Sequence, residues 1–492
     1  MRLHGLLWHT GPVTRFHNYR SRWAPRAAAL IAVGIAALAL RLIHLHAVWS
    51  LMVDELPPPG MDRWLNMQIA SAIAEGDWLG GWAAPFDSSP GYSYALAVLY
   101  SLSGRHWAVP LIVQLVLGAT TPLLVYDIGR RHRGHAVGLV AALLAALYQP
   151  AIFYEGLLVK FSLVPVTTAF VLLALLRVRD GELRWALPAG LALGGLALLR
   201  PNMLVVAPVV ATWASLGAGG RVAIQRSALL AAGAAVLLVP MSVRDHLAGS
   251  RGRAAALGGI HFYIGTNPKA DGEYVVLDGI RPDIVGHVVD ARREAERRVG
   301  RTLSGPEVSR FWFERGLAFI RADPMRYARL EARKLRLSLD ASESGSFGDD
   351  FDSARQLSPV LGLPLVTFGT VAPLGFVGLV GCIRRRQLLL PLFVCATLVS
   401  LLPFFIAGRY RLPLAPPMIV LAAIGIDGID GLMRRHGRAA LAMVVPGLAL
   451  GAVVLGDSDA QVLTLFVALG LGLLVVRHLD RDPSRFEIAE RP

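Results

Sequence analysis

The sequence predicts an all-α polytopic membrane protein with about 12 transmembrane helices. Composition is the first reason, because 54% of the 492 residues are hydrophobic and 17% are charged, at a mean hydropathy of +0.52. Such a chain has too few polar residues to cover the surface of a soluble protein. The second reason is that apolar runs of roughly 20 residues recur along the chain. The third is that short arginine clusters separate these runs.

Charge and cysteine content argue against several other classes of protein. The formal net charge of +14 could indicate nucleic-acid binding, but the arginines lie in short clusters between apolar runs rather than on one face. The only two cysteines, Cys382 and Cys395, fall in or beside apolar segments, so no disulfide framework is expected. No Walker A, HExxH or paired CxxC pattern occurs, and cytoplasmic nucleotide chemistry therefore has no support.

The arginine clusters also give the direction of each predicted crossing, because positively charged loops stay in the cytoplasm. Residues 1–26 form a cytoplasmic segment whose arginines precede a long apolar run, which indicates a retained anchor rather than a signal peptide. Residues 477–492 form a cytoplasmic tail. The predicted spans are 27–49, 107–128, 135–151, 157–176, 185–200, 202–217, 227–243, 359–381, 388–407, 412–432, 439–455 and 460–476.

This topology divides the chain into three larger parts. Residues 27–243 form an N-terminal transmembrane module that includes an outer loop at 50–106, and residues 359–476 form the C-terminal transmembrane helices. Between them, residues 244–358 form a small α-rich extracytoplasmic domain. Two helix starts are predicted in that domain, one at Ser304 before Pro306 and one at Asp323 before Pro324.

The first outer loop is expected to hold two helices. In "MDRWLNMQIASAIAEGDW", apolar residues recur at helical spacing from Leu65 to Ile73, and Gly76 is placed to end the helix. The stretch 90–104 is too short to cross the membrane, and its tyrosines suit the headgroup zone, so we expect an interfacial helix there.

Acidic residues near the predicted outer surface are candidates for chemistry. Asp62 stands at the start of the first-loop helix, where its carboxylate can be an N-cap or can point into a cavity as a general base. Asp54 and Glu55 are second-ranked candidates just after the first span. Glu155 lies in the next short outer loop, where an ionisable residue at membrane depth indicates a site, or else an ion pair with Lys160.

Several cations lie at outer ends of apolar segments, where positive charge is disfavoured. Interface snorkelling accounts for any one of them, but it accounts less well for the set, and an anionic lipid phosphate is an obvious partner. The stretch "HFYIGTNPKADGEY" can line a sugar pocket or form a surface turn. The predicted phosphate-binding residues are Lys160, Arg200, Arg409 and Arg411, and the predicted substrate-pocket residues are Tyr92, Tyr94, His261, Asn267 and Tyr410.

The chain resembles the C-type glycosyltransferase superfamily, in particular the family 39-like group of protein O-mannosyltransferases and lipid A aminoarabinose transferases. The resemblance runs over most of residues 27–432 and is carried by "MDRWLNMQIASAIAEGDWLG", "PGYSYALAVLYSLSG", "YDIGRRHRGHAVGLVAALLAALYQPAIFYEG", "LALGGLALLRPN" and "GRYRLPLAPPMIVLAAIG". The essential first-loop aspartate of these enzymes matches Asp62, although their familiar Asp-Glu pair occurs here as Asp54-Glu55. Their second acidic position matches Glu155.

This resemblance implies the superfamily's fold and an enzyme that transfers a sugar from a polyprenyl-phosphate donor to an extracytoplasmic hydroxyl, lipid or glycan, with inversion. Asp62 would be the base, and Glu155 would orient the acceptor or hold a divalent metal ion, which would be the only cofactor. The enzyme would lie in a bacterial cytoplasmic membrane with its active site facing the periplasm. The alternatives are a lipid-linked glycan polymerase or ligase, and a non-enzymatic lipid or solute transporter.

Overall fold

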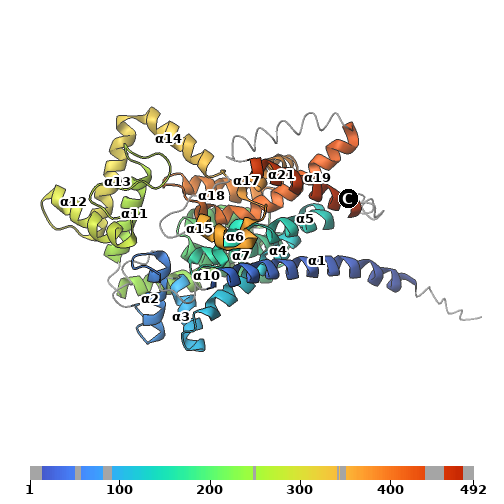
Figure 1. Ribbon diagram of the computed structural model, residues 1–492, viewed down its shortest axis with the longest axis horizontal. Helices are drawn as coiled ribbons and strands as arrows, with labels where there is room; N and C mark the ends of the chain where they lie inside the picture. Colours follow the sequence, from blue (N-terminus) through green and yellow to red (C-terminus); the bar gives the residue numbers. More distant parts are fainter. Residues whose placement is uncertain are drawn as a thin grey trace, which may run out of the picture.

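The structure, a computed structural model, describes residues 14–49, 57–80, 91–247, 251–340, 343, 351–437 and 459–479. Within these ranges the chain forms helices and no β-strand, and the sole β-bridge joins Tyr148 to Val366. The all-α prediction is therefore confirmed. A bundle of long helices occupies one part of the molecule, and the helices of the predicted extracytoplasmic domain gather at one end of that bundle (Figure 1).

The bundle is built from apolar helices whose positions follow the predicted spans. Its longer members are α1 (Thr14–Ala47), α4 (Ala108–Arg133), α5 (His135–Ala146), α7 (Val164–Arg179), α8 (Ala186–Leu199), α9 (Met203–Ser215), α10 (Gly220–Leu247), α17 (Phe368–Arg384), α18 (Leu389–Leu401), α19 (Ala415–His436) and α21 (Asp459–Leu479). Short elements join them: α6 (Gln149–Glu155), η3 (Lys160–Leu163), η4 (Leu183–Trp185), α16 (Pro359–Gly362) and η6 (Gly408–Leu414).

The chain is a multi-pass membrane protein. Five described segments are long and apolar enough to cross a membrane, namely Ala27–Ala47, Ala108–Arg133, Lys160–Arg179, Gly220–Leu247 and Gly408–His436. Further apolar helices of 10–17 residues coincide with other predicted spans. The predicted span 439–455 lies outside the described residues, and the count of about 12 stays a prediction.

Close approach of small residues packs the bundle. Helices α17 and α19 meet at Gly378, where an added Cβ would lie 1.8 Å from the carbonyl oxygen of Leu421. The same holds where α8 crosses α10, since a Cβ at Gly190 would lie 2.1 Å from the oxygen of Leu230. Contacts of this kind let helices associate in a membrane, where lipid offers no hydrophobic driving force between them.

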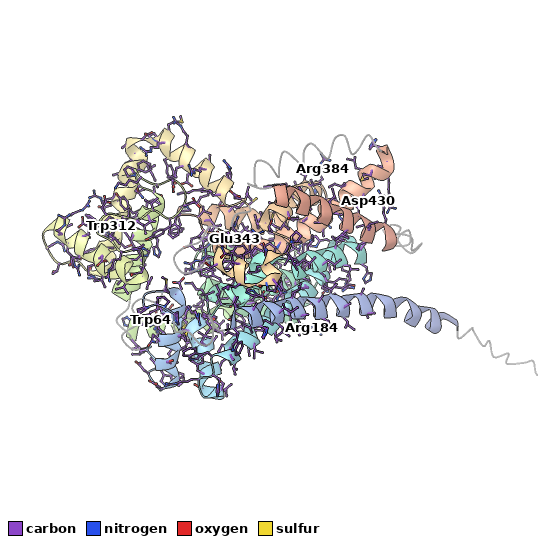
Figure 2. The ribbon with its side chains drawn as sticks, in the orientation of Figure 1. Trp64, Arg184, Trp312, Glu343, Arg384 and Asp430 are labelled. Carbon is purple, nitrogen blue, oxygen red and sulfur yellow. The ribbon has the colours of Figure 1, made fainter. Side chains whose placement is uncertain are left out.

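Ion pairs tie the helices together at the end of the bundle remote from the loop domain. Asp127 on α4 accepts from Arg130 at 2.5 Å and from Arg177 on α7 at 3.1 Å. Asp430 on α19 accepts from Arg477 on α21 at 2.8 Å. Figure 2 shows Arg384 and Asp430 at this end and Trp312 of the loop domain at the other. Arginines from two of the clusters used to predict the cytoplasmic side, Arg130 and Arg177, therefore meet at one shared carboxylate.

The loop domain has helices and a hydrophobic core of its own. Its elements are α11 (Arg251–Gly265), the π-helical turn η5 (Gly286–Asp290), α12 (Ala291–Val299), α13 (Gly305–Ala322), α14 (Pro324–Leu337) and α15 (Phe351–Leu357). Trp312 and Ile260 are buried in this core together with Phe405, which follows α18. Both predicted starts are confirmed: Ser304 and Glu307 form a capping box on α13, and Asp323 accepts from the amide of Arg326 on α14.

The first outer loop forms α2 (Asp62–Ala74) and α3 (Gly91–Ser103), as predicted. Helix α2 buries Leu65, Ile69 and Ile73, and Gly76 follows its end with φ +102°, a value that favours glycine. The interpretation of Asp62 as an N-cap is wrong. Met61 is the N-cap, and Asp62 is the first helical residue, which leaves its carboxylate available to another partner.

Candidate active site

A cavity of about 710 Å³ lies where the bundle meets the loop domain. Its lining comes from the start of α2, from η3, from the junction of α8 and α9, from η6, and from the loop-domain elements α11 and η5. Six of the predicted site residues and one stretch that was missed meet here. Those that line the cavity as predicted are Asp62, Lys160, Arg200, His261, Arg409 and Tyr410; the stretch that was missed contains Asp283 and His287.

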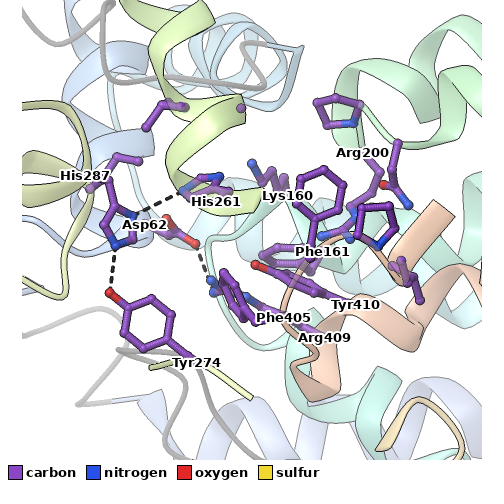
Figure 3. A pocket seen from close by; sticks show the side chains of 18 of the residues that line it. Asp62, Lys160, Phe161, Arg200, His261, Tyr274, His287, Phe405, Arg409 and Tyr410 are labelled. Atoms are coloured by element: carbon purple, nitrogen blue, oxygen red, sulfur yellow. Dashed lines mark hydrogen bonds and ion pairs between the residues drawn. The ribbon is translucent and has the colours of Figure 1, made fainter. Parts of the chain in front are cut away.

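One side of the cavity, here called the bundle wall, consists of Lys160, Phe161, Arg200, Arg409 and Tyr410. The Arg200 guanidinium lies 4.3 Å from the ring centre of Tyr410, and that of Arg409 lies 4.6 Å from the ring centre of Phe161. Aromatic faces stabilise cations where water is scarce. They hold these two guanidinium groups together beside Lys160 without neutralising them (Figure 3).

Arg200 gives the clearest indication that the cavity suits an anion. Helix α8 ends at Leu199 because Pro201 prevents the helix from continuing, and this places Arg200 directly after the last helical residue. The residue is 8% exposed, and its Nε has no hydrogen-bond partner among the described residues. A buried cation is costly unless opposite charge lies nearby, and Arg200 shares the carboxylate of Asp62 with Arg409, so this arrangement suits a site that a further anion fills.

Asp62 faces the bundle wall across the cavity. Its Oδ2 lies 2.9 Å from Nη1 of Arg409, and its side chain is 34% exposed, so a ligand in the cavity can still reach it. Burial alone would raise the pKa of this carboxyl, but Arg409 and Lys160 outweigh that effect and hold the pKa below its usual value. Asp62 is therefore ionised at neutral pH.

The opposite side, here called the loop-domain wall, consists of His261, Tyr274, Asp283 and His287. A hydrogen-bonded chain runs along it: the Tyr274 hydroxyl lies 2.7 Å from Nε2 of His287, whose Nδ1 lies 3.2 Å from Nε2 of His261. Figure 3 shows this chain ending beside Asp62. Phe405 closes the gap between the walls, with its ring centre 5.1 Å from that of Tyr274 and 5.5 Å from that of Tyr410.

Both histidines of this wall are uncharged at neutral pH. Burial lowers the pKa of His261 to about 3, aided by His287 and Lys160 nearby, and burial lowers the pKa of His287 to about 4. Burial likewise raises the pKa of Tyr274 to about 12. The wall therefore presents neutral hydrogen-bonding groups, with Asp283 as its one charged member among the described lining residues.

The cavity also reaches an apolar surface of the bundle. Val205 on α9 and Val399 on α18 both line it, and they are 55% and 61% exposed. The two helices pack against each other, and both consist almost entirely of apolar residues. In a membrane, this flank would face lipid tails rather than water.

Glu155 does not line the cavity. Its carboxylate pairs with Arg41 on α1, and both side chains are 1% exposed. Gln114 on α4 donates to the carbonyl oxygens of Glu155 and Leu157 at 2.8 and 2.7 Å, and its own oxygen accepts from Ser162 at 3.0 Å. This network clamps the segment that carries Lys160 and Phe161.

The other predicted residues that the structure describes lie elsewhere, each with a partner that accounts for its position. Arg411 is buried against Glu343, 2.9 Å away, so its charge is already neutralised. Tyr92 donates to Gln114 at 3.0 Å, and Tyr94 donates to the carbonyl oxygen of Trp78. Asn267 donates to the Tyr263 carbonyl at 2.9 Å. Asp54 and Glu55 lie outside the described residues.

The described residues do not fit a metal ion. No group of three or more His, Cys, Asp or Glu side chains converges among them. At Glu155, the proposed ligand, a guanidinium already occupies the position that a cation would take.

Comparison with known proteins supports the resemblance. Residues 87–244 match the family model described as dolichyl-phosphate-mannose-protein mannosyltransferase. This match confirms the predicted resemblance to the C-type glycosyltransferase superfamily over that range, which contains Lys160 and Arg200. Asp62 and Arg409 lie outside it.

Two solved structures of an oligosaccharyltransferase from Archaeoglobus fulgidus are also similar. The apo form is 13% identical with a TM-score of 0.47, covering 91% of this chain and 56% of that chain. The complex of oligosaccharyltransferase AglB with an inhibitory peptide and a dolichol-phosphate is 13% identical with a TM-score of 0.46, covering 92% and 56%. This chain thus spans little more than half the length of those enzymes. No curated protein matches it.

Proposed function

We propose that this protein is a membrane glycosyltransferase that moves a sugar from a polyprenyl-phosphate-linked donor to an acceptor on the extracytoplasmic side of a bacterial cytoplasmic membrane. One observation carries the proposal. An ionised carboxylate, Asp62, faces Lys160, Arg200 and Arg409 across a single cavity at the end of a membrane bundle. A base and an anion site are the two parts that transfer from a phosphate-linked sugar requires.

The bundle wall suits the phosphate of the donor. Arg200 and Arg409 offer planar guanidinium groups that can each make two hydrogen bonds to phosphate oxygens, and Lys160 adds a third positive charge. Burial of these cations strengthens their attraction for an anion, because the surrounding dielectric constant is low. The charge that develops on the departing phosphate is then stabilised by groups already in position.

The apolar flank between α9 and α18 suits the lipid part of such a donor. Val205 and Val399 connect the cation-lined cavity to the outward surface of the bundle. A polyprenyl chain lying there would stay among lipid tails while its phosphate reached Arg200. A water-soluble sugar nucleotide gains nothing from this flank, and the family that matches residues 87–244 is named for a lipid-linked sugar donor.

In the proposed reaction, Asp62 takes the proton of the acceptor hydroxyl as the acceptor oxygen bonds to the anomeric carbon. The bond between that carbon and the phosphate oxygen breaks, and its electron pair leaves with the polyprenyl phosphate. Attack opposite to the leaving group inverts the anomeric centre. Phosphate is a good leaving group, so no strong acid is needed, and Glu155 acts as a positioning residue that holds the Lys160 segment.

Reconstitution in proteoliposomes tests the proposal. The wild type is expected to bind undecaprenyl phosphate and to consume a radiolabelled undecaprenyl-phosphate sugar, whereas Asp62→Asn is expected to bind the lipid without consuming the donor. A transporter would instead move the lipid across the bilayer equally well with Asn at position 62. A polymerase or ligase would yield a product lengthened by more than one sugar. Failure of the folded wild type to bind undecaprenyl phosphate would contradict the proposal.

A further inference from the structure

The two walls of the cavity differ in charge. Every cation among the described lining residues belongs to the bundle wall, and the loop domain contributes Asp283, Tyr274 and two uncharged histidines. Arg281 precedes Asp283 by two residues, but it is paired with Asp290 at 2.7 Å and does not line the cavity. An anion beside the loop-domain wall would therefore meet two carboxylates, Asp62 and Asp283, and the wall itself would offer it no positive charge among the described lining residues.

The loop-domain wall is nevertheless rich in hydrogen-bonding groups. Each neutral imidazole offers one donor and one acceptor, so the chain from Tyr274 through His287 to His261 can run in either direction. The ring of His261 ends this chain next to Asp62 (Figure 3). A hydroxyl group both donates and accepts, and it can complement the chain in either direction. A fully ionised phosphate only accepts.

His287 is held in place by an uncommon piece of backbone. It lies in the π-helical turn Gly286–Asp290, where its amide donates to the Asp283 carbonyl at 3.0 Å, and the Asp283 carboxylate accepts from the amide of Gly286 at 2.6 Å. Single π-turns are rare and are frequent at functional sites. The turn directs the imidazole into the cavity, although a regular helix would have satisfied the same backbone groups.

Aromatic surface lies next to these polar groups. The ring of Phe405 is 6.4 Å from the ring of His261 and 5.1 Å from that of Tyr274, measured between centres. Sites for small organic ligands combine such apolar surface with a few placed polar groups. The wall thus has an apolar face, neutral donors and acceptors, and an adjacent base.

We propose that the loop-domain wall is the acceptor subsite and that it selects an uncharged, hydroxyl-bearing acceptor over a phosphate-bearing one. This inference rests on the proposed function, which assigns the donor phosphate to the bundle wall. The separation of charge keeps the donor phosphate and the acceptor on opposite sides of the anomeric carbon. It also leaves Asp62 within reach of the acceptor hydroxyl, because the carboxylate lies between the two walls.

Two matched amphiphiles test the inference on the full chain in nanodiscs. n-Hexyl β-D-glucopyranoside is the neutral probe, n-hexyl phosphate is the anionic probe, and radiolabelled undecaprenyl phosphate reports on the bundle wall. The glucoside is expected to bind saturably while undecaprenyl phosphate stays bound, and hexyl phosphate is expected to displace undecaprenyl phosphate.

The double variant His261→Gln, His287→Gln is expected to weaken glucoside binding by about tenfold. Its affinity for undecaprenyl phosphate should change less than about twofold, because the altered groups are uncharged. His106→Gln, an exposed histidine on the α3–α4 connection, is the matched control and should change neither affinity.

Three results would overturn the inference. They are hexyl phosphate binding alongside undecaprenyl phosphate, glucoside binding that the double variant leaves intact, and no saturable glucoside binding. If the wild type also failed to bind undecaprenyl phosphate, the proposed function itself would fall. Intact undecaprenyl phosphate binding together with any of the three results removes the acceptor assignment alone.

Discussion

The bundle wall and the loop-domain wall face the same cavity, yet they are built in different ways. The bundle wall is formed at the ends of apolar elements, where Arg200 follows α8 and Arg409 lies in η6. The guanidinium groups of these two residues pack against the rings of Tyr410 and Phe161. The loop-domain wall uses a helix, a loop and a π-turn to assemble uncharged imidazoles and a phenol.

The difference shows how a membrane protein can keep two polar substrates apart. Cations in a buried site raise the cost of protonating a nearby histidine, which adds to the effect of burial in lowering the pKa of His261. The charge on one wall therefore helps to keep the other wall neutral. Asp62 is an anion, unlike the cations of the bundle wall and the neutral histidines of the loop-domain wall. It contacts the bundle wall through Arg409.

The largest effect is expected at Asp62, the carboxylate between the walls. Asp62→Asn should lower the rate of sugar transfer by about 10²–10⁴-fold, because general-base catalysis contributes that much and an amide cannot take the proton. Undecaprenyl phosphate should bind at least as tightly as before, since a negative charge beside Arg409 has been removed. Single-turnover transfer and equilibrium binding measure the two quantities separately.

The matched control is Asp77→Asn, an exposed carboxylate of the same outer loop. It should leave both quantities unchanged. Transfer by Asp62→Asn at the wild-type rate would remove Asp62 as the base and leave the bundle wall as an anion site only.

The next effect concerns the stability of the bundle wall. Glu155→Gln should lower the free energy of unfolding by about 3–5 kcal/mol, because it leaves the buried guanidinium of Arg41 without its counter-charge. The double variant Arg41→Met, Glu155→Gln should recover much of this loss, since both charges are then absent. Thermal unfolding in detergent, followed by tryptophan fluorescence, measures the difference.

Glu75→Gln breaks a comparable ion pair in an exposed setting. Glu75 and Arg105 are 59% and 46% exposed, so the loss should stay below about 1 kcal/mol. If the double variant of Arg41 and Glu155 proved as unstable as Glu155→Gln, the buried pair would not be the cause.

A smaller effect is expected at Arg200. Arg200→Gln should weaken undecaprenyl phosphate binding by roughly 10–100-fold, the amount that charge-assisted hydrogen bonds contribute, and Arg200→Lys should give an intermediate value. The affinity for a neutral glucoside should not change. Arg184→Gln is the control, because Arg184 is 79% exposed and lies on the α7–α8 connection, away from the cavity. Equal weakening of both ligands would show that the walls are not separate sites.

The two walls also differ in how far the sequence reveals them. Lys160, Arg200 and Arg409 stand out in the sequence because each interrupts an apolar run on the side where positive charge is disfavoured, and the structure brings all three together. His287 and Asp283 lie in a polar stretch where such residues are ordinary. A π-turn has no sequence pattern of its own, so nothing in the sequence singled them out.

Glu155 shows a second limit of prediction from sequence. A carboxylate five residues before Lys160 suggests a local ion pair or a site, but its partner is Arg41, 114 residues earlier in the chain. Arg41 lies within the first apolar run, and nothing in the local sequence indicates that it pairs with Glu155. Helix positions and caps depend on local patterns and could be predicted, whereas this pairing depends on how α1 packs against α6, which local patterns do not encode.

The smallest effect is the contribution of the loop-domain wall to the pH dependence of stability. The folded-state pKa values of His261 and His287 are about 3 and about 4, below the ordinary value of 6.5, so the unfolded chain binds more protons between these values. Their neutral forms therefore stabilise the fold fully above pH 6.5, and stability falls as pH decreases. Between pH 6.5 and 5.5 the loss should be about 1 kcal/mol for each histidine.

The double variant His261→Gln, His287→Gln should make the dependence of stability on pH shallower in thermal unfolding measured at several pH values. Asp62 does not contribute to the slope in this pH range. Its pKa is lowered from 3.8, so its contribution to stability is lost only at more acidic pH. His106→Gln should keep the wild-type slope. An unchanged, wild-type slope in the double variant would mean that His261 and His287 are already protonated in the folded protein, and the loop-domain wall would then carry positive charge like the bundle wall.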